Sequence, residues 1–412
     1  MNANKKEVGL PYDGGEYQNP NPNTLKGGLE APYTWDMDLL EFYGENNRAP
    51  DCVYPVKAVY GADRVSVTGN GRARVGQGVR EKEYKEYFSR CHELGIEFHY
   101  LFNAAFVDGR EWDPAFRDKL RRKVDELVAA GVDCLVLANP ALAFDLKAWH
   151  PEVKVGTSVN MHLDGVTRVQ QLLGYVGADT IMFDHGNSRD VRSIRALRRE
   201  FPGLPIIVLV NESCLLRCVL QPYHQAALCS NSRCDGCVND PDFCHLLCAR
   251  AKLLEPFNVL RAPWWRPEDL HYLFGAGATL VKLAGRTEPS AKIKEIVRAY
   301  STGRFTGDIW SLVEKSGLTN PVWEEMSGRA LPACRFRVDN GALDGFIRPW
   351  VEGRAPCIRN QFGCGSCQWC SQFMHAVTLP DNRAQRLEDI AELLAMCAKG
   401  DLVRRSEMRE AA

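Results

Sequence analysis

The stretch PIIVLVNE, residues 205–212, contains five consecutive aliphatic residues and ends in the polar pair Asn211 and Glu212. An unbroken apolar run of this kind, without alternating polar residues, is typical of a strand that is covered on both faces. Parallel strands buried on both faces occur almost only in α/β proteins. The stretch therefore predicts an α/β fold, and a segment rich in cysteine begins at its polar end.

Seven further runs of similar character occur before residue 302, each followed by a helical pattern or a long loop. The eight predicted strands span residues 53–61, 96–104, 134–140, 154–161, 180–186, 205–212, 258–265 and 279–287. Eight such units over about 250 residues have the number and length of a TIM-type (β/α)8 barrel. A doubly wound open sheet would give similar local patterns, so the prediction of a barrel depends on the count.

Three regions are expected along the chain. An irregular segment rich in Pro, Gly and Asn, residues 1–48, precedes a barrel over residues 49–302. A cysteine-rich loop, residues 211–248, is inserted after the sixth predicted strand, and residues 303–412 form a C-terminal extension. Because the βα loops at the carboxyl ends of the strands form the active sites of such barrels, we expect this insertion at the mouth.

Charge and hydropathy exclude some classes of partner. The chain of 412 residues has a formal net charge of −1 and a pI of about 6.8, so no overall positive field favours tight binding of nucleic acid. The longest apolar runs are too short to span a bilayer. The first residues, MNANKKEVGLPYDGGEY, lack the apolar stretch of a secretory signal,. We therefore expect a cytoplasmic protein with no membrane association.

The 16 cysteines fall into two groups and five isolated positions. A reducing compartment disfavours a disulfide framework, so the groups indicate metal sites. In the first group, Cys214 and Cys218 and later Cys244 and Cys248 form two C-x3-C pairs. Such pairs, brought together across a long loop, suit a [4Fe–4S] cluster held by four thiolates. The role of the three middle cysteines, at positions 229, 234 and 237, is left open.

The second group is CIRNQFGCGSCQWC, with Cys357, Cys364, Cys367 and Cys370. Its C-x2-C-x2-C core resembles the run that binds iron–sulfur clusters in bacterial ferredoxins, although the trailing Pro is absent. We predict a metal site on these four thiols, with a second [4Fe–4S] cluster as the first choice and zinc as the alternative.

Polar residues at the ends of the predicted strands would project into the barrel mouth. The candidates for proton transfer are Glu212, His185 and Asp184. Glu212 lies two residues before Cys214, where burial would raise its pKa and prepare it for this role. The candidates for substrate binding are Asn103, Asn139, Asn160, Arg261, Trp264, Lys282 and Arg286.

Each candidate also has a purely structural interpretation. Arg261, Lys282 and Arg286 would bind the carboxylate or phosphate of a small anionic substrate, or they could form a solvated rim. The first two of the three asparagines could cap the helices that follow them. Asp184 could anchor a loop, and Trp264 could stack on a planar substrate or fill the mouth.

Several motifs together resemble the peptidase U32 family, particularly a cysteine-rich anaerobic branch of it. They are VYPVKAVYG, GIEFHYLFNA, GVDCLVLANP, VNESCLLRCVLQPYH, DFCHLLC, WWRPEDLHYL, VKLAGRT, DNGALDGF and the CGSCQWC core. The resemblance implies a TIM-type barrel, and several family members carry an oxygen-sensitive [4Fe–4S] cluster on four cysteines. Members take part in hydroxylations without dioxygen, in ubiquinone biosynthesis and on transfer or ribosomal RNA, with prephenate as oxygen source, whereas others are named collagenase-like peptidases. The cysteine spacing here differs from that of the hydroxylases.

The function that these features favour is an iron–sulfur oxidoreductase. It would perform dioxygen-independent hydroxylation, or a related oxygen-atom or electron transfer, on a small anionic substrate, with an electron-donor or partner protein. Three alternatives stay open: an RNA-modifying hydroxylase of the same family, a U32-type peptidase, and a zinc-stabilised binding protein without redox activity. No HExxH or GxSxG motif occurs in the sequence, which weakens the peptidase alternative,.

Overall fold

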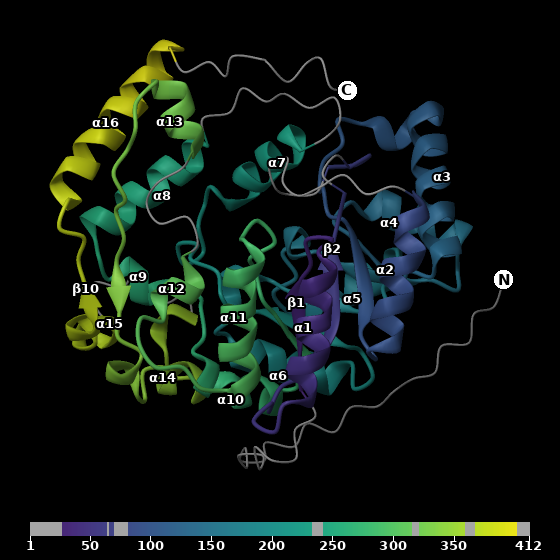
Figure 1. Ribbon diagram of the computed structural model, residues 1–412, viewed down its shortest axis with the longest axis horizontal. Helices are drawn as coiled ribbons and strands as arrows, with labels where there is room; N and C mark the ends of the chain where they lie inside the picture. Colours follow the sequence, from purple (N-terminus) through teal and green to yellow (C-terminus); the bar gives the residue numbers. More distant parts are fainter. Residues whose placement is uncertain are drawn as a thin grey trace.

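A closed parallel sheet forms the centre of the computed structural model, which describes residues 27–63, 66–69, 81–232, 242–314, 321–358 and 367–401. The eight strands are ordered β5-β4-β3-β2-β1-β8-β7-β6. The two outermost strands of this list also meet, because Asp179 N donates to Val155 O at 2.8 Å and Thr157 N donates to Thr180 O at 3.1 Å. The predicted TIM-type (β/α)8 barrel is therefore confirmed (Figure 1),.

The strands of the barrel are short. They are β1 Gly28–Pro32, β2 Val56–Gly61, β3 Glu97–Phe102, β4 Cys134–Leu137, β5 Lys154–Thr157, β6 Ile181–Phe183, β7 Ile206–Leu209 and β8 Leu280–Lys282. Two further strands, β9 Arg337–Val338 and β10 Val377–Thr378, pair antiparallel in the C-terminal extension.

Helices surround the barrel and continue into the extension, drawn in green to yellow on one side of Figure 1. Around the barrel lie α1 Met37–Arg48, α2 Glu81–Glu93, α3 Pro114–Ala130, α4 Pro140–Trp149, α5 Val166–Tyr175, α6 Val191–Glu200, α10 Leu270–Ala276 and α11 Ser290–Thr302. The cysteine-rich segment and the residues after it form α7 Gln221–Asn231, α8 Phe243–Leu254 and α9 Asn258–Arg261. The extension contains α12 Trp310–Val313, α13 Pro321–Ser327, α14 Arg348–Val351, α15 Trp369–Gln372 and α16 Arg383–Lys399. None of the helices in the described ranges has the length and apolar character that crossing a membrane requires.

The two faces of the strands bury different side chains. On β3, Phe98, Tyr100 and Phe102 point outward into the main apolar core, where the helices cover them,. Leu101, between them, points inward and joins a small second cluster with Cys134 and three other residues. Apolar side chains therefore fill only part of the barrel interior. Polar groups, described below, occupy another part.

The first strand and the seventh predicted strand correct the sequence analysis. β1 lies within the segment expected to be irregular, so the barrel begins near Gly28 and not at residue 49. A Cβ on Gly28 would stand 2.6 Å from Cδ of Lys57, so the side chain of Lys57 packs closely over this glycine,. Residues 258–265 form α9 and an irregular turn instead of a strand. The cysteine-rich loop therefore follows the seventh strand, β7, and not the sixth.

The C-terminal extension packs onto the barrel through aromatic side chains. Trp264, from the loop before α10, stacks on Phe346 with ring centroids 6.2 Å apart and meets Trp310 at 6.4 Å. Nε of Arg383, at the start of α16, donates to Leu253 O of α8 at 2.6 Å. The extension is thus held against the cysteine-rich segment and the carboxyl side of the barrel.

Candidate functional site at the carboxyl end of the barrel

A cluster of imidazole and carboxylate groups lies just beyond the ends of β5 and β6. Asp184 follows β6 directly, and one of its oxygens accepts a hydrogen bond from Nδ1 of His162 at 3.0 Å. Its other oxygen accepts from Nδ2 of Asn187 at 2.8 Å. Gln221, at the start of α7, brings its amide nitrogen to 3.2 Å from Nδ1 of His185 and 3.4 Å from Nδ1 of His162.

These contacts keep Asp184 charged. Burial by itself would raise the pKa of this carboxyl, but the hydrogen bond from His162 and the charge of His185 hold the pKa below its ordinary value,. His162 has a positive φ of 52°, a conformation that is uncommon outside glycine and that often marks functional sites,. The cluster offers an ionised acceptor between two imidazoles, an arrangement able to hold and move a proton.

The cluster contains two predicted residues and two that the sequence analysis missed. Asp184 and His185 were selected because they end a predicted strand. His162 was missed because it lies beyond the end of β5, although it is two residues after the candidate Asn160. Gln221 carried no signal, because only the fold brings α7 over the mouth.

Glu212, the third candidate for proton transfer, lies one position beyond an anchoring residue. Asn211 is fully buried, and its side chain donates to Ala284 O at 3.0 Å and accepts from Ala284 N at 2.6 Å, which ties the end of β7 to the end of β8. Glu212 is partly exposed, and its carboxylate accepts from Ser213 N at 3.2 Å. A role for Glu212 in proton transfer stays a prediction.

The asparagines expected to bind substrate make contacts within the protein. Oδ1 of Asn139 accepts from Ala141 N at 3.0 Å and from Leu142 N at 3.3 Å, so it caps α4, as the structural alternative proposed,. Nδ2 of Asn160 donates to the backbone oxygen of Asn103 at 2.8 Å. Asn160 and Asn103 therefore link the ends of β5 and β3 at the mouth.

Trp264 and Lys282, two further candidates for substrate binding, are engaged by other groups of the protein. Trp264 is 1% exposed, and its Nε1 donates to Val259 O at 2.8 Å, so it fills the interface with the extension. Lys282 points into the barrel, where its Nζ lies 2.7 Å from Glu30 and 3.3 Å from the centre of the Tyr60 ring. Neither side chain is placed to meet a substrate at the rim, whereas Arg286 is partly exposed there.

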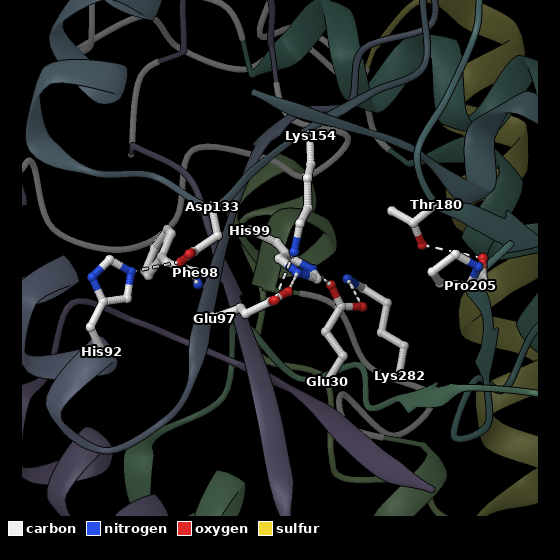
Figure 2. A network of polar contacts seen from close by, with 10 residues as sticks. All are labelled: Glu30, His92, Glu97, Phe98, His99, Asp133, Lys154, Thr180, Pro205 and Lys282. Carbon is white, nitrogen blue, oxygen red and sulfur yellow. Dashed lines mark hydrogen bonds and ion pairs between the residues drawn. The ribbon is translucent and has the colours of Figure 1, made fainter. Parts of the chain in front are cut away.

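Lys282 belongs to a polar network inside the barrel that Figure 2 shows. Glu30 accepts from Lys282 on one oxygen and lies 2.7 Å from Nδ1 of His99 on the other. Nε2 of His99 lies 3.4 Å from Glu97, which pairs with Lys154 at 2.8 Å. Burial alone would raise the pKa of Glu30, but the two cationic partners lower it to about 2. The network thus joins four strands through alternating charges, and residues far apart in the sequence supply them.

The first cysteine group gathers beside a buried cation. Lys252 of α8 is 1% exposed and pairs with Glu314 at 3.1 Å. Burial would lower the pKa of Lys252, but the neighbouring thiols of Cys248 and Cys214 and the Glu314 carboxylate raise it. Burial raises the pKa of the Cys248 thiol, Lys252 opposes this rise, and Cys218 adds to it. Cys244, the fourth predicted ligand, is buried one helical turn before Cys248. Binding of one metal by the four predicted ligands stays a prediction.

The second cysteine group lines a cavity of about 370 Å³. Cys357, Cys367 and Cys370 contribute to its wall, together with the guanidinium-bearing side chain of Arg261 and with Leu216 of the cysteine-rich segment. The remaining wall is mostly apolar and aromatic, from Phe257, Pro349, Trp350, Ala355, Pro356, Gln368, Trp369 and Ser371. Cys364 lies outside the described residues, as do Cys234 and Cys237.

Arg217 connects this cavity to the imidazole cluster. Its Nε donates to Oδ1 of Asn187 at 2.8 Å, and Asn187 in turn binds Asp184. Its Nη2 donates to Ile358 O at 3.4 Å, next to Cys357. Two residues, Asn187 and Arg217, therefore connect Asp184 to the backbone of Ile358, the neighbour of Cys357 in the chain.

The thiol side chains of both groups are suitable ligands for a soft metal, although the described sulfur atoms are not arranged around one metal position. Thiolates select zinc and iron–sulfur clusters, and none of the described cysteines is paired in a disulfide,. Over the described ranges, no three or more His, Cys, Asp or Glu side chains stand in a metal-binding arrangement. The residues therefore fit a metal by their type. In the second group, three described thiols also line one cavity.

Comparison with known proteins identifies relatives. No protein-family model matches the chain. An uncharacterized protease of Methanocaldococcus jannaschii is 25% identical over 306 residues, which cover 74% of this chain and 84% of that protein. The chain is similar to this protein over about three quarters of its length.

Several solved structures are similar to the chain at low sequence identity. A U32 peptidase structure has a TM-score of 0.44 and 15% identity, covering 68% of this chain and 97% of that one. An aldolase from Escherichia coli K12 has a TM-score of 0.38 and 9% identity, covering 73% and 96%. The first of these structures is that of a U32 peptidase, a member of the family that the sequence motifs also resemble. The names of the relatives describe proteases and peptidases, and they carry no statement about iron–sulfur chemistry.

Proposed function

We propose that this protein is an iron–sulfur oxidoreductase that performs dioxygen-independent hydroxylation, or a related oxygen-atom or electron transfer, on a small anionic substrate. The observation that carries the proposal is the shared cavity of Cys357, Cys367, Cys370 and Arg261. It combines soft metal ligands with a cation in one partly apolar space. The Asp184 cluster, joined to it through Arg217, supplies acid–base groups.

The residues of the chain divide the work as follows. Arg261 holds a carboxylate or phosphate of the substrate, because a guanidinium binds such groups through two parallel hydrogen bonds. Asp184 keeps His162 oriented, and His162 or His185 takes up and returns the proton,. The cysteine-rich segment covers the mouth and limits the access of water. A bound cluster would transfer electrons. A hydroxylation that takes its oxygen from water removes two electrons from the substrate, and the cluster would accept them and pass them to a partner protein.

The alternatives make different demands on the same residues. A U32-type peptidase, suggested by the names of the relatives, needs an open metal site and an activated water, and thiolate ligands favour a closed or redox site instead. An RNA-modifying hydroxylase needs a basic surface, which a net charge of −1 does not favour unless a partner supplies it,. A zinc-stabilised binding protein would keep both cysteine groups and lack redox activity.

Anaerobic purification with counts of iron, sulfide and zinc tests the proposal. Wild-type protein should be brown and contain iron and acid-labile sulfide. Cys214→Ala should remove the iron of the first group and Cys367→Ala that of the second, whereas Cys52→Ala, at an isolated cysteine, should lose none. Colourless protein with stoichiometric zinc would overturn the redox function. Iron that neither Cys214→Ala nor Cys367→Ala reduces would overturn the ligand assignment.

A further inference from the structure

Arg189 is a buried cation that the proposed chemistry does not use. It lies in the loop after β6 and is 2% exposed. Its Nε and Nη2 donate to Trp264 O at 3.0 and 2.7 Å, and its Nη1 donates to Leu260 O at 2.8 Å. Its guanidinium carbon lies 5.3, 5.1 and 5.0 Å from the ring centres of Trp264, Phe346 and Trp350.

Arg189 contacts backbone carbonyl oxygens and aromatic rings, and none of these partners carries a negative charge. Within the described ranges, no carboxylate oxygen lies within 4.0 Å of its side-chain nitrogens. Asp269, the nearest acidic side chain that acts on it, is engaged by Arg266 at 3.9 Å. A charge buried in this way is costly unless an opposite charge compensates it.

One aromatic ring that contacts Arg189 also belongs to the cavity of the second cysteine group. Trp350, one of the three rings around the guanidinium, is also part of the wall of the cavity that Cys357, Cys367 and Cys370 line. Burial lowers the pKa of Arg189 to about 10, and the leading charges that act against this are those of Cys370 and Cys357. A buried guanidinium without a carboxylate partner among the described residues therefore shares the Trp350 ring with the cavity that these cysteines line.

We propose that Arg189 is a positioning residue that supplies the counter-charge of an anionic sulfur centre formed by Cys357, Cys367 and Cys370. The inference rests on the proposed function, in that the thiols bind a metal as thiolates. A fixed positive charge favours the more negative state of such a centre, so it raises the reduction potential and strengthens metal retention. Because Arg189 joins barrel carbonyls to rings of the extension, it also holds the extension at the mouth.

Three variants separate charge from shape. Arg189→Met removes the charge and keeps an apolar chain, whereas Arg189→Lys keeps the charge. Arg198→Met is the matched control, because Arg198 also donates to a backbone carbonyl, Gly277 O at 3.1 and 2.8 Å, and burial alone acts on its pKa. The signal of the second centre is defined as the one that Cys367→Ala removes.

The readouts are iron per protein and the midpoint potential of that signal, from an anaerobic titration with dithionite followed by electron paramagnetic resonance. We expect Arg189→Met to lower this potential and Arg189→Lys and Arg198→Met to leave it near the wild-type value. Full iron and an unchanged potential in Arg189→Met would overturn the proposal. If Arg189→Met cannot retain the metal, retention in Arg189→Lys supports the role of charge, and loss in Arg189→Lys overturns it.

Zinc in the second centre would refute the proposed redox function there and leave this inference testable. Zinc retention is then compared during titration with EDTA, and Arg189→Met should lose zinc at about 10-fold lower chelator concentration than wild type. Equal retention in Arg189→Met and wild type would overturn the counter-charge role. Wild-type protein that binds neither metal at Cys367 would overturn both proposals.

Discussion

Replacement of Lys282 by methionine should destabilise the barrel strongly. Nζ of Lys282 lies 2.7 Å from Glu30, whose side chain is 1% exposed, and His99 occupies the other oxygen at 2.7 Å (Figure 2). Methionine keeps most of the apolar chain, so the loss is mainly electrostatic. The carboxylate of Glu30 would then stay buried beside one cation instead of two.

The size of the effect follows from the pKa of Glu30. Burial by itself would raise this pKa, and Lys282 and His99 bring it from the ordinary 4.5 down to about 2. That difference corresponds to about 3 kcal/mol of stability at neutral pH. Breaking one partner of a buried pair costs about 3–5 kcal/mol, because the remaining charge keeps its desolvation penalty. We therefore expect Lys282→Met to lower the free energy of unfolding by about 3–5 kcal/mol.

Urea unfolding at pH 7, followed by tryptophan fluorescence, measures this loss. The matched control is Lys154→Met at the other end of the same network, where Lys154 is about half exposed and pairs with the half-exposed Glu97. Exposed pairs contribute about 1 kcal/mol or less, so this control should change little. A loss for Lys282→Met below about 1 kcal/mol, or equal to that of the control, would refute the reasoning.

The pH dependence supplies a second, independent check. Because the folded-state pKa of Glu30 is depressed, its contribution is fully present above pH 4.5 and is lost as the pH falls toward 2,. Wild-type protein should therefore lose stability in this window. In Lys282→Met the pKa of Glu30 rises, so the loss between pH 4.5 and 2 should be smaller. Identical slopes for the two proteins would contradict the role assigned to Lys282.

Three further substitutions test other parts of the structure. Asn139→Ala should cost about 1 kcal/mol in urea unfolding, because it removes the cap of α4, whereas Asn139→Asp should retain the cap,. Lys252→Met should cost about 3–5 kcal/mol by leaving Glu314 buried and unpaired, and the double variant with Glu314→Gln should recover part of this; no recovery would argue against the pair,. Gly277→Ala should lower the thermal midpoint by an amount equivalent to about 1–3 kcal/mol, because φ is 108° and the new Cβ would lie 2.6 Å from Cβ of Arg198; an unchanged midpoint would refute the strain,.

Local pattern in the sequence was sufficient for most of the barrel. Six of the apolar runs that predicted strands contain β2 to β7, and the last run, at 279–287, contains β8. The helix α3 begins at Pro114, with Asp113 as its cap, and ends at Gly131, as these residue types predict,. Such features depend on neighbours within a few positions, so one sequence carries them. The two cysteine groups were visible for the same reason.

Contacts between distant segments decided the rest. β1 has the sequence GLEAP, which carries no strand signal, and it forms because β2 and β8 pair with it on both sides. The partners of Glu30 are His99 and Lys282, 69 and 252 positions away, and the rings around Arg189 also come from distant parts of the chain, including α14. Buried charges of this kind are stable only where the fold brings opposite charges together, and spacing along a chain does not record that proximity. The sequence by itself therefore determined the strands β2 to β8 and the positions of the two cysteine groups, whereas the tertiary structure alone decided the place of β1 and which charges compensate one another.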